Sequence, residues 1–214
     1  MGHTLLFAGK PKFDMMDREW SQFGAPDTVG ADNGTDKIDY YQRLDPALAV
    51  DVLFQQMNAD PDLQYMFFHI RTPDEIGHLF GWATADYRNA ATTADTILGR
   101  ILDGIDANPA WASSTAVIVV ADHGGPTLEF FHSDHTIRED YTIPFVVYGP
   151  GVAWGTDLYQ LNPDDRAWPF TNRPPATGVQ PIREHEVANL ALDLLGYPSV
   201  PGSVFNLAQD LNVS

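Results

Sequence analysis

The sequence contains no cysteine and only three lysines among its 214 residues. The absence of cysteine excludes disulfides, thiolate zinc sites and cysteine nucleophiles, and it leaves the cellular compartment open. No apolar run approaches the ~18 residues that a membrane-spanning helix needs, so we expect no membrane segment. The first residues also lack the basic start, long apolar core and small-residue cleavage site of a secretory signal peptide.

Acidic residues far outnumber basic ones, and the formal net charge is −17 at pH 7. A surface of this charge repels phosphate backbones, so we expect no nucleic-acid binding. The simplest interpretation is a solvated surface that keeps the protein soluble, and adaptation to salty surroundings is the alternative. Hydrophobic residues make up 44% of the chain, which is enough for a globular protein.

Two kinds of apolar segment alternate along the chain. Short apolar runs bounded by turn residues predict strands, and apolar residues at helical spacing predict helices. Residues 71–83 are expected to form a loop. The pattern predicts an α/β fold of three layers, a mostly parallel central sheet with helices on both faces, in a single domain over 1–214. The expected strands are 4–8, 65–70, 116–120 and 143–148. One expected helix starts at Asp45-Pro46, with Leu53, Phe54 and Met57 on its apolar face, and the others are 85–108 and 182–195.

Carboxylate and imidazole side chains lie next to three of the expected strands. The segment "RTPDEIGH" follows the strand at 65–70, "DHGG" follows "TAVIVV", and "LEFFHSDH" precedes the strand at 143–148. In α/β sheets, ligands bind outside the carboxyl ends of the strands. We therefore expect one set of side chains to converge there, namely Asp74, His78, Asp122, His123 and His132.

Imidazole and carboxylate together are a ligand set that suits zinc. Calcium prefers more oxygens and magnesium keeps its waters, so neither explains the histidines. Asp74 and His78 are four residues apart and can reach one ion from one loop or helical turn. Each motif is weak by itself, because a histidine in a loop is usually a hydrogen-bonded structural residue. The convergence of the motifs is what indicates a metal site.

Three other histidines have different interpretations. His69 lies inside an apolar strand, where we expect a hydrogen-bonded core residue. His185 is on the last expected helix, where we expect a surface residue. His135 is three residues from His132 and is an alternative to it as a ligand.

The segments "PDEIGHLFGW", "VIVVADHGG" and "FFHSDHTIREDYTIPFVVYGPGV", in this order, resemble the alkaline phosphatase superfamily. The similarity is strongest to its phosphodiesterase/nucleotide pyrophosphatase and sulfatase-like branch. It extends over nearly the whole chain, through "FAGKPKF", "GADNGTDKID" and "LALDLLGYPSVPGS". The resemblance implies an alkaline-phosphatase-like fold and metal-dependent hydrolysis of small phosphate mono- or diesters, with sulfate esters less favoured.

The resemblance also implies the ligands of two divalent metals, commonly zinc, which in this family lie about 4 Å apart at the strand ends. Carried over by motif, Asp74, His78 and His132 bind one metal. Asp122 and His123 bind the other. His132 is preferred to His135 because its spacing to the "Y-x-I-P-F" strand matches that of the family's third histidine.

The family has two further parts, a metal-binding aspartate after its first strand and a Ser or Thr nucleophile at a helix N-terminus. Both precede the segment that resembles "GHTLLFAGKPKF". We therefore expect the first strand and helix, one ligand and the nucleophile to lie upstream of residue 1, and the chain alone to be inactive. The second metal site, with Asp122 and His123, is expected to be weak or empty in this chain. A signal peptide would lie upstream too, so an extracytoplasmic location is compatible with the resemblance.

Alternatives stay open at this point. A fragment of a longer enzyme is the favoured interpretation, and a non-catalytic remnant that binds a metal or a partner is the other. A cofactor-independent phosphosugar mutase of the same superfamily is the second enzyme class. Without a central strand the sheet would expose an edge and an apolar face, so we also expect a need for the upstream segment or self-association.

Overall fold

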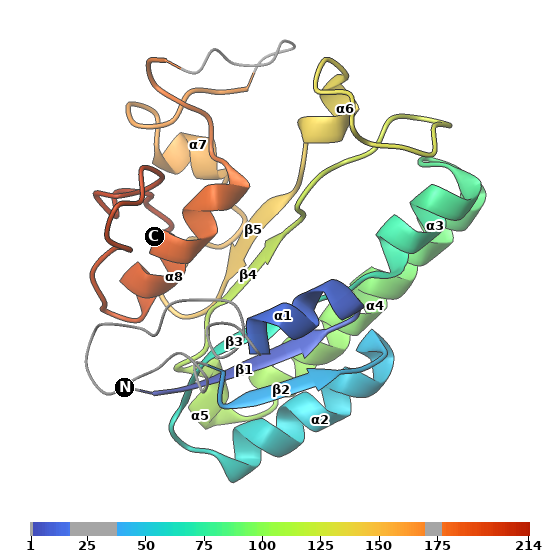
Figure 1. Ribbon diagram of the computed structural model, residues 1–214. Helices are drawn as coiled ribbons and strands as arrows, with labels where there is room; N and C mark the ends of the chain where they lie inside the picture. The colour runs from blue at the N-terminus through green and yellow to red at the C-terminus, as the bar shows by residue number, and fades with distance from the viewer. Residues whose placement is uncertain (1, 18–37, 170–176) are drawn as a thin grey trace. The chain divides into compact units, whose positions relative to one another are not determined.

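The computed structural model describes residues 2–17, 38–169 and 177–214 (Figure 1). The chain forms two compact units. The first combines Met1–Ile76 with Ala85–Gly104, and the second combines Gly77–Thr84 with Ile105–Ser214. Among the described helices, none has the length and apolar character that a membrane span requires.

A three-stranded parallel sheet forms the centre of the first unit. Its strands are β1 (His3–Ala8), β2 (Tyr40–Arg43) and β3 (Leu63–Phe68), in the order β2-β1-β3. Leu5 of the middle strand pairs with Tyr40 on one side and with Met66 on the other. The last four residues of β1 are at most 4% exposed, as expected for an apolar strand with neighbours on both edges.

Helix α2 (Pro46–Ala59) runs along this sheet (Figure 1). It begins where the sequence predicts, because the Asp45 carboxylate accepts a 3.0 Å hydrogen bond from the Ala47 N–H and a proline opens the first turn. Arg100 of helix α4 (Ala85–Asp106) donates to the carbonyl of Ala47 at 2.9 Å and to Asp51 at 2.8 Å. These bonds join the part of α4 in the first unit to α2.

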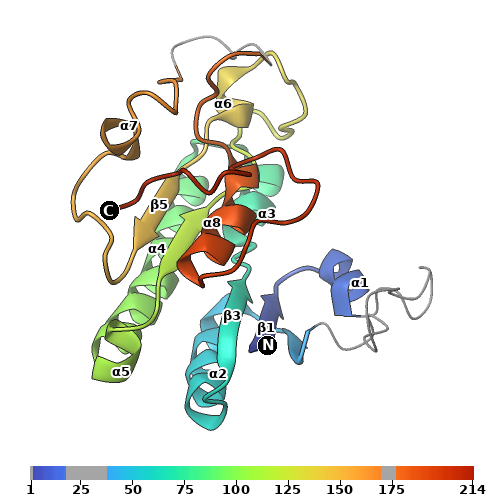
Figure 2. The same cartoon turned by 90° about the vertical axis from the view of Figure 1, so that its left-hand side faces the viewer.

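In the second unit, β4 (Val117–Val120) and β5 (Phe145–Tyr148) form a two-stranded antiparallel sheet. Helix α8 (Val187–Leu194) packs against it, and its fully buried Leu190 is in the same apolar cluster as Ile118 and Phe145 (Figures 1 and 2). The C-terminal residues Leu211 and Val213 complete this core.

The predicted α/β class is confirmed, and the strands of the first unit are parallel as expected. The antiparallel pairing of β4 with β5 differs from the expected parallel arrangement. A parallel connection needs a crossover of a dozen or more residues, usually a helix. Between β4 and β5 the only helix is α6 (Arg138–Tyr141), which is a single turn.

The prediction of a loop at 71–83 is wrong, because Thr72–Phe80 form helix α3. A proline in its first turn, followed by Asp74 and Glu75, favours a helix start. The strand expected at 65–70 lies at Leu63–Phe68 instead. The last helix begins later than expected, with a 3₁₀ turn before it.

The other short elements are η1 (Pro11–Phe13), α1 (Asp14–Asp17), α5 (Pro109–Ala112), α7 (Leu158–Leu161) and η2 (Glu184–Glu186).

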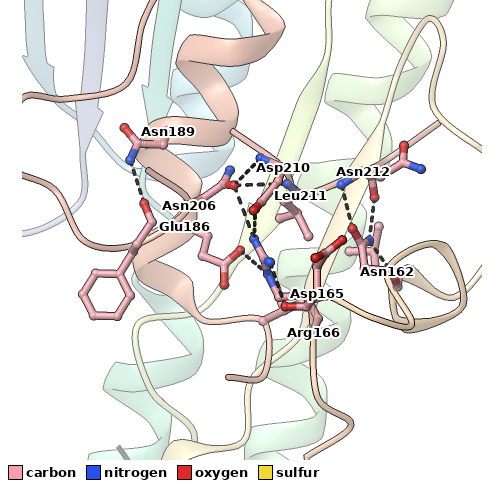
Figure 3. Close-up of polar contacts among 12 residues, drawn as sticks. Asn162, Asp165, Arg166, Glu186, Asn189, Asn206, Asp210, Leu211 and Asn212 are labelled. Carbon is pink, nitrogen blue, oxygen red and sulfur yellow. Dashed lines mark hydrogen bonds and ion pairs between the residues drawn. The ribbon is translucent and has the colours of Figure 1, made fainter. Parts of the chain in front are cut away.

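A buried arginine ties the C-terminal segment to the rest of the second unit (Figure 3). The Arg166 side chain is 8% exposed. Its Nε donates to Glu186 at 3.0 Å, and its Nη2 donates to Asp210 at 2.8 Å and to Asn206 at 3.3 Å. The guanidinium therefore joins η2 to two residues near the C-terminus, neither of which lies in a helix or strand.

Two buried asparagines fix the same segment (Figure 3). The Asn162 side chain donates to the carbonyl of Asn212 and accepts from its N–H, both at 2.8 Å. Asn189 donates to the carbonyl of Phe205 at 2.6 Å and accepts from the N–H of Val200 at 2.8 Å. Because a buried amide without partners is costly, these bonds specify one path for a segment that lacks regular secondary structure.

Replacing Arg166 by methionine should lower the free energy of unfolding by about 3–5 kcal/mol, since it leaves Glu186 as an unpaired buried charge. The matched control is Arg100→Met, whose ion pair with Asp51 has side chains 42% and 68% exposed. Exposed pairs contribute about 0–1 kcal/mol. Urea unfolding of both variants measures the difference, and equal losses would contradict the role given to Arg166.

A glycine in the middle of α4 offers a stabilising substitution. No heavy atom lies within 4 Å of the position that a Cβ would take at Gly99. Alanine in a helix interior is about 1 kcal/mol more favourable than glycine, so Gly99→Ala should raise the free energy of unfolding by about that amount. At Gly104 of the same helix, a Cβ would lie 2.1 Å from Cζ of Phe54. Gly104→Ala should therefore show no such gain in thermal or urea unfolding.

Candidate metal centre

Four of the five predicted ligands lie in the second unit, and three of these are imidazoles in ring contact. The rings of His123 and His132 are stacked, with centroids 3.5 Å apart and 6° between their planes. The ring of His78 lies 5.1 Å from that of His132. Three imidazoles that are far apart in the sequence are therefore neighbours in space.

Backbone hydrogen bonds explain how the loop after β4 reaches the end of α3. The N–H of Trp82 donates to the carbonyl of Glu129 at 3.1 Å, and the N–H of Leu128 donates to the carbonyl of Trp82 at 3.0 Å. Trp82 also forms an isolated parallel bridge with Thr127. This pairing brings the residues before His132 alongside the turn that follows α3.

Hydrogen bonds also orient two of the histidine rings. Nδ1 of His78 is 2.7 Å from the carbonyl oxygen of Phe130, and Nδ1 of His123 is 2.8 Å from that of Gly124. A carbonyl oxygen can only accept, so Nδ1 is the donor in each ring and Nε2 carries the lone pair. Histidine ligands of metals usually have this arrangement, in which the second nitrogen donates to a carbonyl or carboxylate.

Two carboxylates belong to this region. The Asp122 side chain is 74% exposed, and its Oδ1 lies 3.7 Å from Nε2 of His123. Glu184 of η2 interacts electrostatically with both residues, and the sequence analysis did not identify it. Burial raises the pKa of Glu184, and the charge of Asp122 raises it further, against the opposing effects of His185 and His123.

Asp74 lies in the first unit, in the first turn of α3. Its carboxylate forms an ion pair with Lys10, which follows β1. The pair places an acidic group after β3 and a basic group after β1, at the carboxyl ends of two parallel strands. The assignment of Asp74 as a metal ligand stays a prediction from its sequence motif.

His69, His135 and His185 each have their own surroundings in the structure. Nδ1 of His69 accepts a hydrogen bond from the N–H of Gly9 at 3.2 Å, and its ring is 4.7 Å from that of Phe13. It is hydrogen-bonded as predicted, but it is half-buried and follows β3 instead of lying within it. His185 is a surface residue, as predicted, with a side chain that is 57% exposed. His135 is exposed, whereas His132 is half-buried against two other imidazoles.

The predicted ligands in the second unit are of residue types that bind zinc. They are the imidazoles of His78, His123 and His132 and the carboxylate of Asp122. Zinc accepts nitrogen and carboxylate oxygen ligands, and calcium and magnesium prefer oxygen alone. The orientation of two rings by backbone carbonyls adds the outer-shell support that such sites require.

Comparison with known proteins agrees with the resemblance seen in the sequence. Residues 5–185 match the family model described as Type I phosphodiesterase / nucleotide pyrophosphatase. The matched range includes all five predicted ligands and Glu184. No curated protein and no solved structure matches the chain.

Proposed function

Because this chain belongs to the type I phosphodiesterase / nucleotide pyrophosphatase family, within the alkaline phosphatase superfamily, we propose that it carries the metal-binding part of a phosphoester hydrolase. The reaction is hydrolysis of small phosphate mono- or diesters. The observation that supports it best is the group of three histidines in the second unit, two of them oriented by backbone carbonyls.

We assign the ligands as the family motifs indicate. His78 and His132, with Asp74, hold one ion, and Asp122 and His123 hold the second. Ions bound by these residues would supply Lewis-acid stabilisation of the charge that develops on the ester oxygens. Zinc is the proposed metal, because the donors are mainly imidazole nitrogens.

Backbone carbonyls and a neighbouring carboxylate prepare the histidines for metal binding in this proposal. The carbonyls of Phe130 and Gly124 keep the proton of each ring on Nδ1, so that Nε2 of His78 and His123 is the coordinating atom. The exposed Asp122 carboxylate lies beside His123 and adds negative charge that favours a cation. Because solvent reaches this carboxylate, its negative charge does not carry the energetic cost of burial.

Replacing His132 by alanine should lower zinc affinity by more than the ~10–100-fold that outer-shell substitutions cost, since it removes a direct ligand. The matched control is His135→Ala, three residues away and exposed, which should leave affinity unchanged. Competition with a chromophoric chelator and elemental analysis measure both variants. Loss of zinc from the His135 variant alone would show that the wrong histidine was chosen.

The phosphoester proposal has a separate test. Inorganic phosphate, the product of monoester hydrolysis, should bind the zinc-loaded protein in calorimetry and should bind zinc-loaded His135→Ala equally well. His132→Ala should bind it far more weakly at the same zinc concentration. Sulfate that binds as tightly as phosphate would argue for sulfate esters instead, and no binding of either anion would contradict the proposal.

A further inference from the structure

We infer that Trp82 is a positioning residue, which holds the three histidines of the second unit in the arrangement that binds metal. The inference rests on the proposed metal site and adds a residue that no motif assigned to it. Trp82 is 3% exposed and follows directly after α3. The segments that carry His78, His123 and His132 all contact it.

The indole ring packs edge-to-face against two of the imidazoles. Its centroid lies 5.1 Å from that of His78, with 78° between the planes, and 5.5 Å from that of His132, with 74°. Aromatic rings at such distances and angles attract one another beyond simple burial. His78 itself is exposed, so contact with the buried indole limits the orientations open to its ring.

Trp82 contacts the segment that carries the third histidine, His123, at a glycine. At Gly125, two residues after His123, a Cβ would lie 2.2 Å from Cδ1 of the indole. At Gly77, one residue before His78, a Cβ would lie 2.4 Å from Cε2 of the same ring. The indole therefore fills the space between α3 and the "DHGG" loop, and both positions require glycine for this close approach.

The backbone of Trp82 fixes the remaining segment. Its N–H and carbonyl pair with Glu129 and Leu128, as described above, and these residues lead into His132. Ring and backbone together thus connect one residue to every segment that carries a histidine. The neighbours of the indole include two imidazoles and the backbone of two glycines.

The test compares three variants with the wild-type chain, namely Trp82→Ala, Trp82→Phe and Gly125→Ala. Zinc affinity should fall ~10–100-fold in Trp82→Ala, the range known for outer-shell partners of metal ligands, and less in Trp82→Phe, which keeps an aromatic ring. Gly125→Ala keeps the tryptophan but displaces it, and it should also weaken zinc binding. Gly99→Ala, with open space at its Cβ, is the control that should bind zinc like the wild type.

A second readout separates positioning from simple packing. Co²⁺ in place of zinc gives visible absorption bands whose position and intensity depend on ligand geometry, so they should change in Trp82→Ala and Gly125→Ala and stay unchanged in Gly99→Ala. If Trp82→Ala and Gly125→Ala lower the melting temperature but keep zinc affinity and the Co²⁺ spectrum, Trp82 is a core residue and the inference is wrong. If the wild type binds zinc only as weakly as His132→Ala, the proposed function fails, and this inference fails with it.

Discussion

The short pairing between Trp82 and the loop after β4 is the contact on which the candidate site depends. The loop that carries His123 and His132 has no long helix of its own, so its backbone groups need partners elsewhere. Trp82 supplies two of those partners. The indole then occupies a space that two glycines leave open, and the imidazoles of His78 and His132 pack edge-to-face against it. Backbone pairing between segments that are distant in the sequence thus decides which side chains can meet.

Charge explains the chemistry of the same region. Asp122 and Glu184 interact unfavourably, and Glu184 Oε2 is buried with no hydrogen-bond partner among the described residues. A carboxylate in this position is costly unless a proton, water or a cation satisfies it. The family to which the chain belongs is metal-dependent, and the matched range contains both acidic groups. In the Arg166 cluster the buried Glu186 already has a guanidinium partner, so that cluster is structural.

Local features of the sequence were enough for much of the fold. The run "TLLFA" is a buried strand because its residues are apolar, and Asp45 with Pro46 starts α2 because capping involves adjacent residues. Helix α3 was missed because its strongest signals, a proline and two acidic residues, are equally common in loops. The antiparallel β4–β5 pair was missed because strand direction depends on what the intervening chain can build.

By itself, the sequence determined the α/β class, the family and the residue types able to bind a metal, since these follow from local pattern and ordered motifs. Only the tertiary structure decided which histidines are neighbours, since ring contacts between positions 78, 123 and 132 depend on long-range packing. The same holds for Trp82, which looks like any buried aromatic in the sequence. Its position beside the histidines results from hydrogen bonds and glycine contacts that span more than forty residues along the chain.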